Sequence, residues 1–285
     1  MTATRTIDAH HHFWRVAEQA QPWRTGDHEA IARDFLPIDL DVHLRACDVD
    51  ATLLVQSVDS REENERLDRL AGETPFVAGV VAWLPLTDPP AAADEMAHLP
   101  APTRGVRCLV GHAPIDRLER PDALAVLTEL AERGLAWDVV PVTAEQTRTV
   151  LRVAREVPGL RVVVDHLARP PLDVADGGAW ERAVRDLATC PNVAVKVSVG
   201  IDLLTRTPWD RSRLCDAVQV VADQVGPRRM MLASNWPVVL LRRSYVGAWS
   251  DLVVAVRTAG IDGEELAEVC GGTAARWYGL ADLAC

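Results

Sequence analysis

The chain of 285 residues lacks several features that mark common functional classes of proteins. It has only 30 lysine and arginine residues against 41 aspartate and glutamate residues, which gives a formal net charge of -11 at pH 7. This shortage of positive charge argues against nucleic acid or an anionic membrane surface as partners. No apolar run reaches the roughly 20 residues that a bilayer span needs, and the first five residues lack the apolar segment of a signal peptide. We therefore expect a cytoplasmic protein.

Paired cysteines and a glycine-rich nucleotide loop are also missing. No Gly-x-Gly-x-x-Gly follows any strand that we predict, which disfavours a doubly wound dinucleotide-binding sheet. Because no two cysteines form a Cys-x-x-Cys pair, we expect buried, reduced thiols and no disulfide framework. The six cysteines are scattered along the chain, at Cys47, Cys108, Cys190, Cys215, Cys270 and Cys285.

Short apolar runs that alternate with longer amphipathic segments predict the fold. The runs show no polar alternation, as expected of parallel strands that are covered on both faces. Eight such strands in one chain of this length favour a single (β/α)8 barrel (TIM barrel) over residues 1–285, with an open α/β sheet as the alternative. We predict strands at residues 6–10, 51–56, 76–83, 105–110, 135–140, 160–166, 193–197 and 229–234, and helices at 60–72, 121–133, 144–156, 179–190 and 211–225.

A histidine cluster follows the first predicted strand. Side chains alternate between the two faces of a strand, so His10 and His12 point one way and His11 the other. Imidazole nitrogen is a common ligand of zinc and related ions, and this pair could hold a cation or polarise a substrate oxygen. The segment 14–36 then forms a long loop with Trp14 and Trp23, and loops of this length usually shape a substrate pocket.

Polar residues recur where the other predicted strands end, the edge at which barrel enzymes place their active sites. His166 closes its strand and faces the same edge as His10 and His12, with Asp165 on the other side or anchoring a loop. Arg107 could clamp a carboxylate or a lactone carbonyl, or form an internal ion pair. The remaining strand-end residues are Gln56, Trp83, Asp138, Lys196, Ser234, Asn235 and Trp236.

Lys196 is the only lysine of the chain. It could stabilise an oxyanion or contact a sugar acid, and the alternative is a buried ion pair. The tryptophans Trp14, Trp23 and Trp236 are either core and lid packing or a platform for substrate.

Eight stretches, in order and covering nearly the whole chain, resemble the amidohydrolase-related lactonases of the L-fuconolactonase and L-rhamnono-lactonase type. The resemblance implies a barrel whose site uses His10, His12 and His166, together with an aspartate after the eighth strand that acts as general base. The stretches are residues 7–14, 55–56 with 63–64, 77–83, 105–107, 164–171, 192–198, 235–238 and 271–280.

Two positions depart from the pattern that this resemblance implies. Asn235 occupies the place of the family's aspartate, and an amide side chain cannot accept a proton from water at a useful pH. Three explanations stay open: an engineered Asp→Asn variant, a natural enzyme that uses another base such as His166, or a binding protein without catalysis. Val199 stands where relatives usually have glycine.

The sequence thus predicts a hydrolase that opens a lactone of a sugar acid or of a small carboxylated ring by means of activated water. We assign catalysis to His10, His12, His166 and Asn235, which are also the candidate ligands of one divalent metal (zinc or manganese); metal-independent catalysis stays open. We assign substrate binding to Arg107, Lys196, Gln56, Trp14, Trp23 and Trp236. A decarboxylase or a C–C or amide hydrolase on the same barrel is the alternative. The expected partner is a small molecule, and a homo-oligomer is a further possibility.

Overall fold

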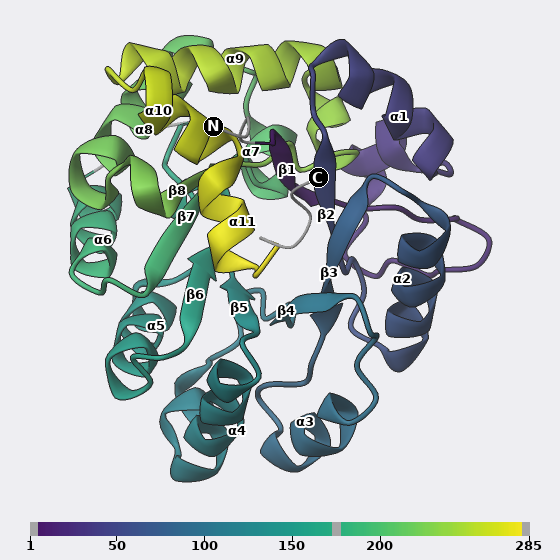
Figure 1. The fold of residues 1–285 in the computed structure, drawn as a ribbon, viewed down its shortest axis with the longest axis vertical. Coiled ribbons are helices and arrows are strands. Elements are labelled where there is room, and N and C mark those ends of the chain that lie inside the picture. Colours follow the sequence, from purple (N-terminus) through teal and green to yellow (C-terminus); the bar gives the residue numbers. More distant parts are fainter. Residues whose placement is uncertain (1–4, 173–177, 281–285) are drawn as a thin grey trace.

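The computed structural model describes residues 5–172 and 178–280 and contains one sheet of eight parallel strands. Each strand pairs with the next one in the chain, so the sheet curls around an axis (Figure 1). The strands are β1 (Ile7–His11), β2 (Ala51–Val55), β3 (Val77–Trp83), β4 (Thr103–Arg107), β5 (Ala136–Val139), β6 (Arg161–Val164), β7 (Val193–Val197) and β8 (Met230–Leu232).

The barrel closes between β1 and the segment that follows β8. The backbone N–H of Asn235 donates to the carbonyl of His10 over 2.9 Å, and that of His12 donates to the carbonyl of Trp236 over 2.7 Å. These two bonds place the end of the last strand beside the histidine cluster of the first. The predicted (β/α)8 barrel is confirmed.

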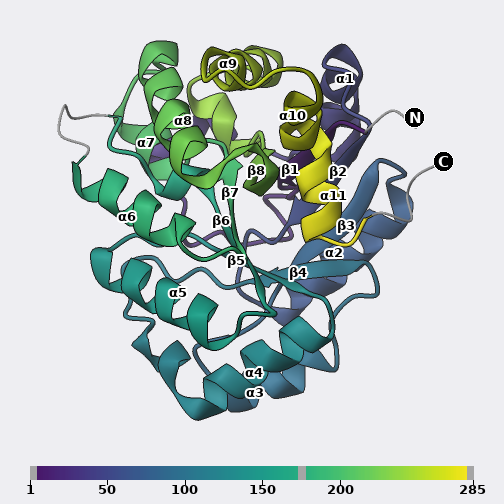
Figure 2. The ribbon, with the colours of Figure 1, turned by 60° about the vertical axis from the view of Figure 1, so that its left-hand side comes forward.

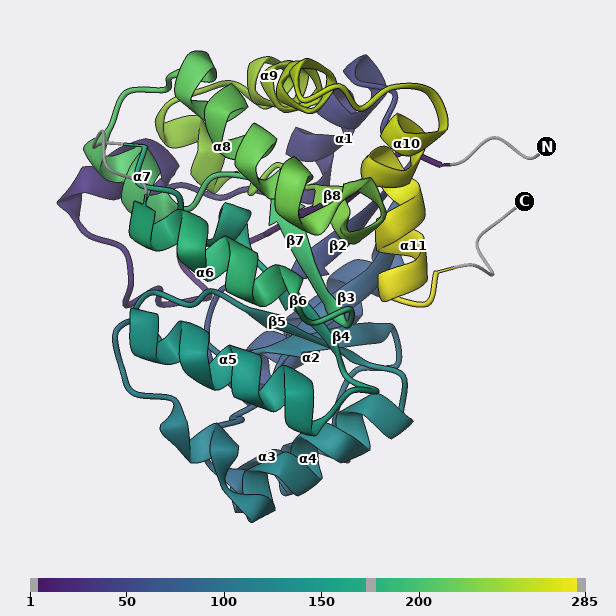
Figure 3. The ribbon, with the colours of Figure 1, turned by 90° about the vertical axis from the view of Figure 1, so that its left-hand side faces the viewer.

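Most of the helices surround the strands on the outside, as the side views show (Figures 2 and 3). Several begin at side-chain caps that the sequence provides: the Ser60 hydroxyl accepts from the N–H of Glu63, and that of Thr143 from Gln146. The helices are α1 (Pro37–Ala46), α2 (Arg61–Glu73), α3 (Pro89–Met96), α4 (Pro121–Glu132), α5 (Ala144–Glu156), α6 (Gly178–Ala188), α7 (Ile201–Arg206), α8 (Arg211–Val225), α9 (Tyr245–Thr258), α10 (Gly263–Ala267) and α11 (Thr273–Trp277).

The five predicted helices correspond to α2, α4, α5, α6 and α8, whereas the other six were not predicted. The predicted fourth strand was displaced, because β4 begins at Thr103 and ends at Arg107. The apolar residues Leu109 and Val110, which suggested a longer strand, line a cavity instead.

Two apolar cores lie on the two sides of the sheet. The larger one fills the space between strands and helices, with residues such as Leu54, Val164 and Leu252. The smaller one fills the barrel interior with residues that alternate with those of the larger core, among them Val163 and Ala194.

The C-terminal segment closes the barrel at the end opposite to the strands' carboxyl ends. Tyr278, directly after α11, belongs to the interior core and is fully buried. A π-helical turn at Glu268–Gly272 precedes α11 and packs against β1 and β8. Within it, a Cβ atom on Gly271 would lie only 1.7 Å from the carbonyl oxygen of Arg5, so only glycine allows this approach.

Two further sequence predictions concern membrane-spanning helices and the state of the cysteines. Within residues 5–172 and 178–280, no helix is long and apolar enough to cross a membrane. The five cysteines in these ranges are free thiols, as predicted, but only Cys190 is fully buried. Cys285 lies outside the described residues.

The close approach at Gly271 yields a stability prediction. Gly271→Ala should lower the free energy of unfolding by about 1–3 kcal/mol, because the added methyl group forces the backbone of the turn away from β1. Gly72→Ala is the matched control, since no atom lies within 4 Å of its Cβ position in α2, and it should leave stability unchanged or slightly raised. Urea unfolding of both variants checks this, and equal stabilities would contradict it.

Candidate active site

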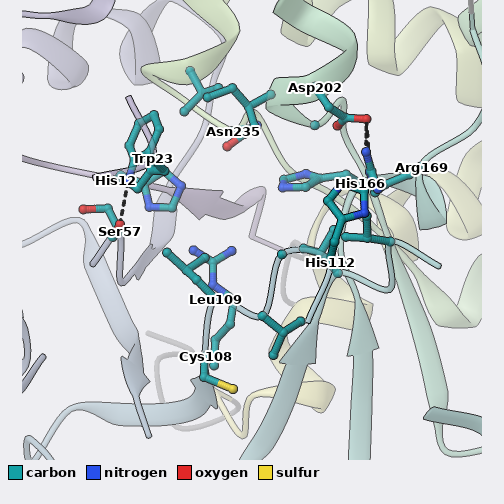
Figure 4. Close-up of a pocket in the computed structure, with 18 of the residues that line it drawn as sticks. His12, Trp23, Ser57, Cys108, Leu109, His112, His166, Arg169, Asp202 and Asn235 are labelled. Atoms are coloured by element: carbon teal, nitrogen blue, oxygen red, sulfur yellow. Dashed lines mark hydrogen bonds and ion pairs between the residues drawn. The ribbon is translucent and has the colours of Figure 1, made fainter. Parts of the chain in front are cut away.

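A cavity of about 330 Å³ opens at the carboxyl ends of the strands (Figure 4). Nearly every strand sends a residue from its end or from the loop after it, as in other (β/α)8 barrels. The lining residues are His12, Trp23, His28, Ser57, Arg107, Cys108, Leu109, Val110, Gly111, His112, Val140, Val142, His166, Arg169, Gly200, Ile201, Asp202, Asn235 and Val238.

Three imidazoles meet at the floor of this cavity. The ring of His10 lies 4.9 Å from that of His12 and 4.8 Å from that of His166, measured between ring centroids. His12 and His166 line the cavity, and His10 is completely buried beneath them. His11 points to the other face, where its Nε2 lies 2.8 Å from the Thr52 hydroxyl. The structure therefore brings together the three histidines that the strand ends suggested.

The backbone fixes the tautomer of His12. Its Nδ1 lies 2.7 Å from the carbonyl oxygen of Val55. Because a carbonyl can only accept, Nδ1 carries the hydrogen and Nε2 offers a lone pair. This Nε2 is 3.2 Å from Nε2 of His10, so the two nitrogens converge on one point.

His166 is held by an unusual turn. The four residues from His166 to Arg169 all have positive φ angles between 52° and 59°, a left-handed conformation that is rare outside glycine. Such strained backbone clusters at functional sites, where the surrounding structure must hold it. Nδ1 of His166 lies 2.8 Å from the hydroxyl of Ser198, a residue that was not among the predicted site residues.

A layer of buried charges supports the histidines from below. Lys196 lies 3.1 Å from Asp165 and also contacts Asp138, while Arg107 donates to Asp165 over 3.1 Å. The Tyr278 hydroxyl donates to Asp138 over 2.7 Å. Two carboxylates thus face two cations, which compensates the cost of burying each charge.

The same layer touches His10 directly. Nδ1 of His10 lies 3.3 Å from the Lys196 ammonium and 3.4 Å from Asp165, and its Nε2 lies 3.4 Å from the Arg107 guanidinium. The expectation that Asp165 points away from the site or anchors a loop was wrong, because its carboxylate lies at the centre of this layer. Its position next to His166 in the sequence was the available signal.

Burial keeps the three imidazoles neutral. It lowers the pKa of His166 to about 4 and the pKa values of His10 and His12 well below their ordinary value. Burial alone would raise the pKa of Asp165, but the Lys196 ammonium, together with a hydrogen bond from His10, outweighs it and holds this pKa well below its usual range. The site therefore presents neutral imidazoles above an ionised carboxylate.

The predicted substrate-binding residues divide into two groups. Arg107 and Trp23 line the cavity, and the indole N–H of Trp23 donates to the Ser57 carbonyl over 2.8 Å. Gln56, Lys196, Trp14 and Trp236 do not line it. Lys196 forms the buried ion pairs that were its alternative interpretation, and Trp14 and Trp236 pack against Phe35 in the core. Their positions therefore do not support direct contact with a ligand in this cavity.

Among the described residues, His10, Asp165 and His166 bring possible metal-ligand atoms within 4.8 Å of one another. His10 and His166 belong to the predicted ligand set, and Asp165 was not in it. Asn235, the fourth predicted ligand, uses its amide nitrogen to donate to the Val199 carbonyl over 2.8 Å.

Comparison with known proteins identifies the family of the chain. The family model described as Amidohydrolase matches residues 7–280. The chain belongs to the amidohydrolase family. The family and the barrel that the sequence predicted are thereby confirmed.

Two curated relatives of this amidohydrolase carry the same name. L-fucono-1,5-lactonase of Burkholderia ambifaria is 34% identical, and the alignment covers 96% of each chain. L-fucono-1,5-lactonase of Burkholderia multivorans is 30% identical, with 98% of this chain and 97% of the relative covered. Among solved structures, an amidohydrolase of B. multivorans with bound zinc is 29% identical and superposes with a TM-score of 0.88, over 96% of this chain and 99% of the other.

The charge layer yields a prediction about Lys196. Lys196→Met should lower the free energy of unfolding by about 3–5 kcal/mol, because it leaves Asp138 buried without a cation. The double variant Lys196→Met/Asp138→Asn should lose less, since Tyr278 can still hydrogen-bond to the neutral amide. Urea unfolding compares the three proteins, and a single variant as stable as the wild type would contradict the role of the ion pair.

Proposed function

We propose that this amidohydrolase opens the lactone ring of a sugar acid by adding water across the ring ester. The meeting of His10, His12 and His166 in one strand-end cavity carries the proposal. The names of its two curated relatives supply the substrate class.

In this proposal the Arg107 guanidinium polarises the lactone carbonyl. Arg107 lines the cavity beside His12 and His166, and it can donate hydrogen bonds to a carbonyl oxygen there, whereas Nε2 of His12 offers a lone pair. Hydrogen-bond donors and positive charge at that oxygen stabilise the negative charge that develops when water attacks. The buried layer of Lys196, Asp138 and Asp165 keeps these groups in place and does not touch the substrate.

The donor set also fits one divalent ion such as zinc or manganese. Two nitrogen ligands of a tetrahedral zinc ion lie about 3.3 Å apart, given zinc–nitrogen bonds of about 2.0–2.1 Å. The Nε2 atoms of His10 and His12 are 3.2 Å apart and His166 lies next to His10, whereas Asp165 contacts the other ring nitrogen of His10, Nδ1. Bound there, the ion would act as a Lewis acid on the carbonyl. The alternative is that Arg107 polarises the carbonyl without an ion.

The charges of the cavity favour an uncharged lactone over a dicarboxylated ring. Arg107 already donates to Asp165 and to the Gln56 carbonyl, and Arg169 pairs with Asp202. Apolar side chains such as Leu109 and Val142 form another part of the wall. We therefore propose a neutral, hydroxylated lactone with an apolar substituent.

A panel of lactones tests the proposal. The purified protein is incubated with 1,4- and 1,5-lactones of sugar acids and with a pyrone dicarboxylate, and acid release is followed with a pH indicator. We expect turnover of neutral sugar lactones, and a loss of about 10²- to 10⁴-fold in kcat for His166→Asn. The control His98→Asn changes an exposed histidine two residues after the end of α3 and should keep full activity.

Measurements after chelation and after addition of zinc or manganese decide whether an ion takes part. Release of carbon dioxide from an aromatic acid would replace the proposal by a decarboxylase. Ligands that raise the melting temperature without any turnover would indicate a binding protein.

A further inference from the structure

The side-chain amide of Asn235 is bound to the peptide of Val199, and this interaction joins the two positions at which the chain departs from the lactonase pattern. Asn235 follows β8, is 2% exposed, and has a φ angle of 56°, which asparagine tolerates better than most residues. Its Nδ2 donates to the Val199 carbonyl over 2.8 Å.

This bond determines what Asn235 presents to the cavity. Because Nδ2 is turned toward Val199, Oδ1 is the atom that faces the cavity, between His12 and His166 (Figure 4). Amide oxygen is a hydrogen-bond acceptor with two lone pairs. The cavity therefore contains an uncharged acceptor held in a fixed orientation.

A carboxylate in the same place would not fit this peptide. An ionised aspartate has acceptors only, so one of its oxygens would face the Val199 carbonyl oxygen at the distance now spanned by a hydrogen bond. Val199 is buried and β-branched, which limits the rotation of its backbone, whereas glycine would leave the peptide freer to turn. Asn235 and Val199 are thus complementary as a pair.

We propose that Asn235 is a catalytic residue that orients the attacking water through Oδ1, and that His166 accepts the proton through Nε2, which is then not a ligand of an ion. This inference rests on the proposed lactonase function. The water oxygen bonds to the ring carbonyl carbon while its proton passes to Nε2 of His166. The tetrahedral intermediate then collapses, the bond from this carbon to the ring oxygen breaks, and the proton passes from His166 to that oxygen. The Ser198 hydroxyl suits this role, because it can accept from Nδ1–H and so leave the lone pair on Nε2.

The test is a double-mutant cycle with Asn235→Asp and Val199→Gly, measured on a sugar lactone that the wild type hydrolyses. We expect Asn235→Asp to lower kcat about 10- to 100-fold with little change in KM, because it disturbs the water and not the lactone. In the Val199→Gly background the same substitution should cost less, since the freed peptide can turn its carbonyl away.

Asn192→Asp provides the matched control. Asn192 also donates through Nδ2 to backbone carbonyls, those of Ala154 and Leu160, but it precedes β7 at the opposite end of the barrel. This control should lose stability and keep the wild-type kcat. A kcat that rises in Asn235→Asp would overturn the inference, because the wild type would then lack a base that aspartate restores.

Thermal unfolding provides a readout that does not need activity. Asn235→Asp should melt below both the wild type and Asn235→Ala, because only the aspartate puts an acceptor against the Val199 carbonyl. If the wild type hydrolyses no lactone, the proposed function fails. The order of the melting temperatures then still tests the interaction between the Asn235 amide and the Val199 carbonyl. An aspartate variant as stable as the wild type would then refute it.

Discussion

The closure of the barrel is the constraint on which the rest of the site depends. Two backbone hydrogen bonds join His10 and His12 to the segment that follows β8. Because strands of a barrel are staggered, these bonds also set the height at which the first and last strands meet. Asn235 takes part in the closure with its own backbone N–H, and its side chain lines the cavity next to the histidines. The position of the eighth-strand residue is thus a consequence of how the barrel is completed.

The buried charges explain why a barrel interior that is otherwise apolar can support polar chemistry. Asp138 and Asp165 face Lys196 and Arg107, and each charge has a partner of opposite sign. With the charges compensated, the imidazoles above them stay neutral and His12 can present a lone pair. The single lysine of the chain belongs to this layer, in a position where its ammonium reaches both carboxylates. The role of Lys196 is to hold His10 and Asp165 in place.

The sequence allowed the strand order and the three histidines to be predicted, because apolar runs define parallel strands and their carboxyl ends gather at one edge. It did not allow the depth of each side chain to be predicted. Lys196 and Asp165 come from strand ends just as His12 does, yet they lie beneath the cavity, since the stagger between strands sets depth and leaves no mark in local sequence. For a related reason, the sequence did not decide whether Trp14 and Trp236 belong to the core or line the pocket. Aromatic residues occur in both places, and only the packing against Phe35 assigns these two to the core.

In the sequence, Asn235 stands where the lactonase pattern has an aspartate. In the structure, its side chain is complementary to the residues around it. Compared with an aspartate, the amide gives up a negative charge and with it the capacity to take a proton. In the structure it gains a donor, and that donor meets the carbonyl of Val199, a residue 36 positions earlier in the chain. The nearby imidazoles are neutral because burial lowers their pKa values, so a proton acceptor remains in the cavity without the carboxylate. In the proposed mechanism, His166 therefore replaces the aspartate as general base without any additional residue. The uncharged side chain of Asn235 then only has to hold the water next to His166.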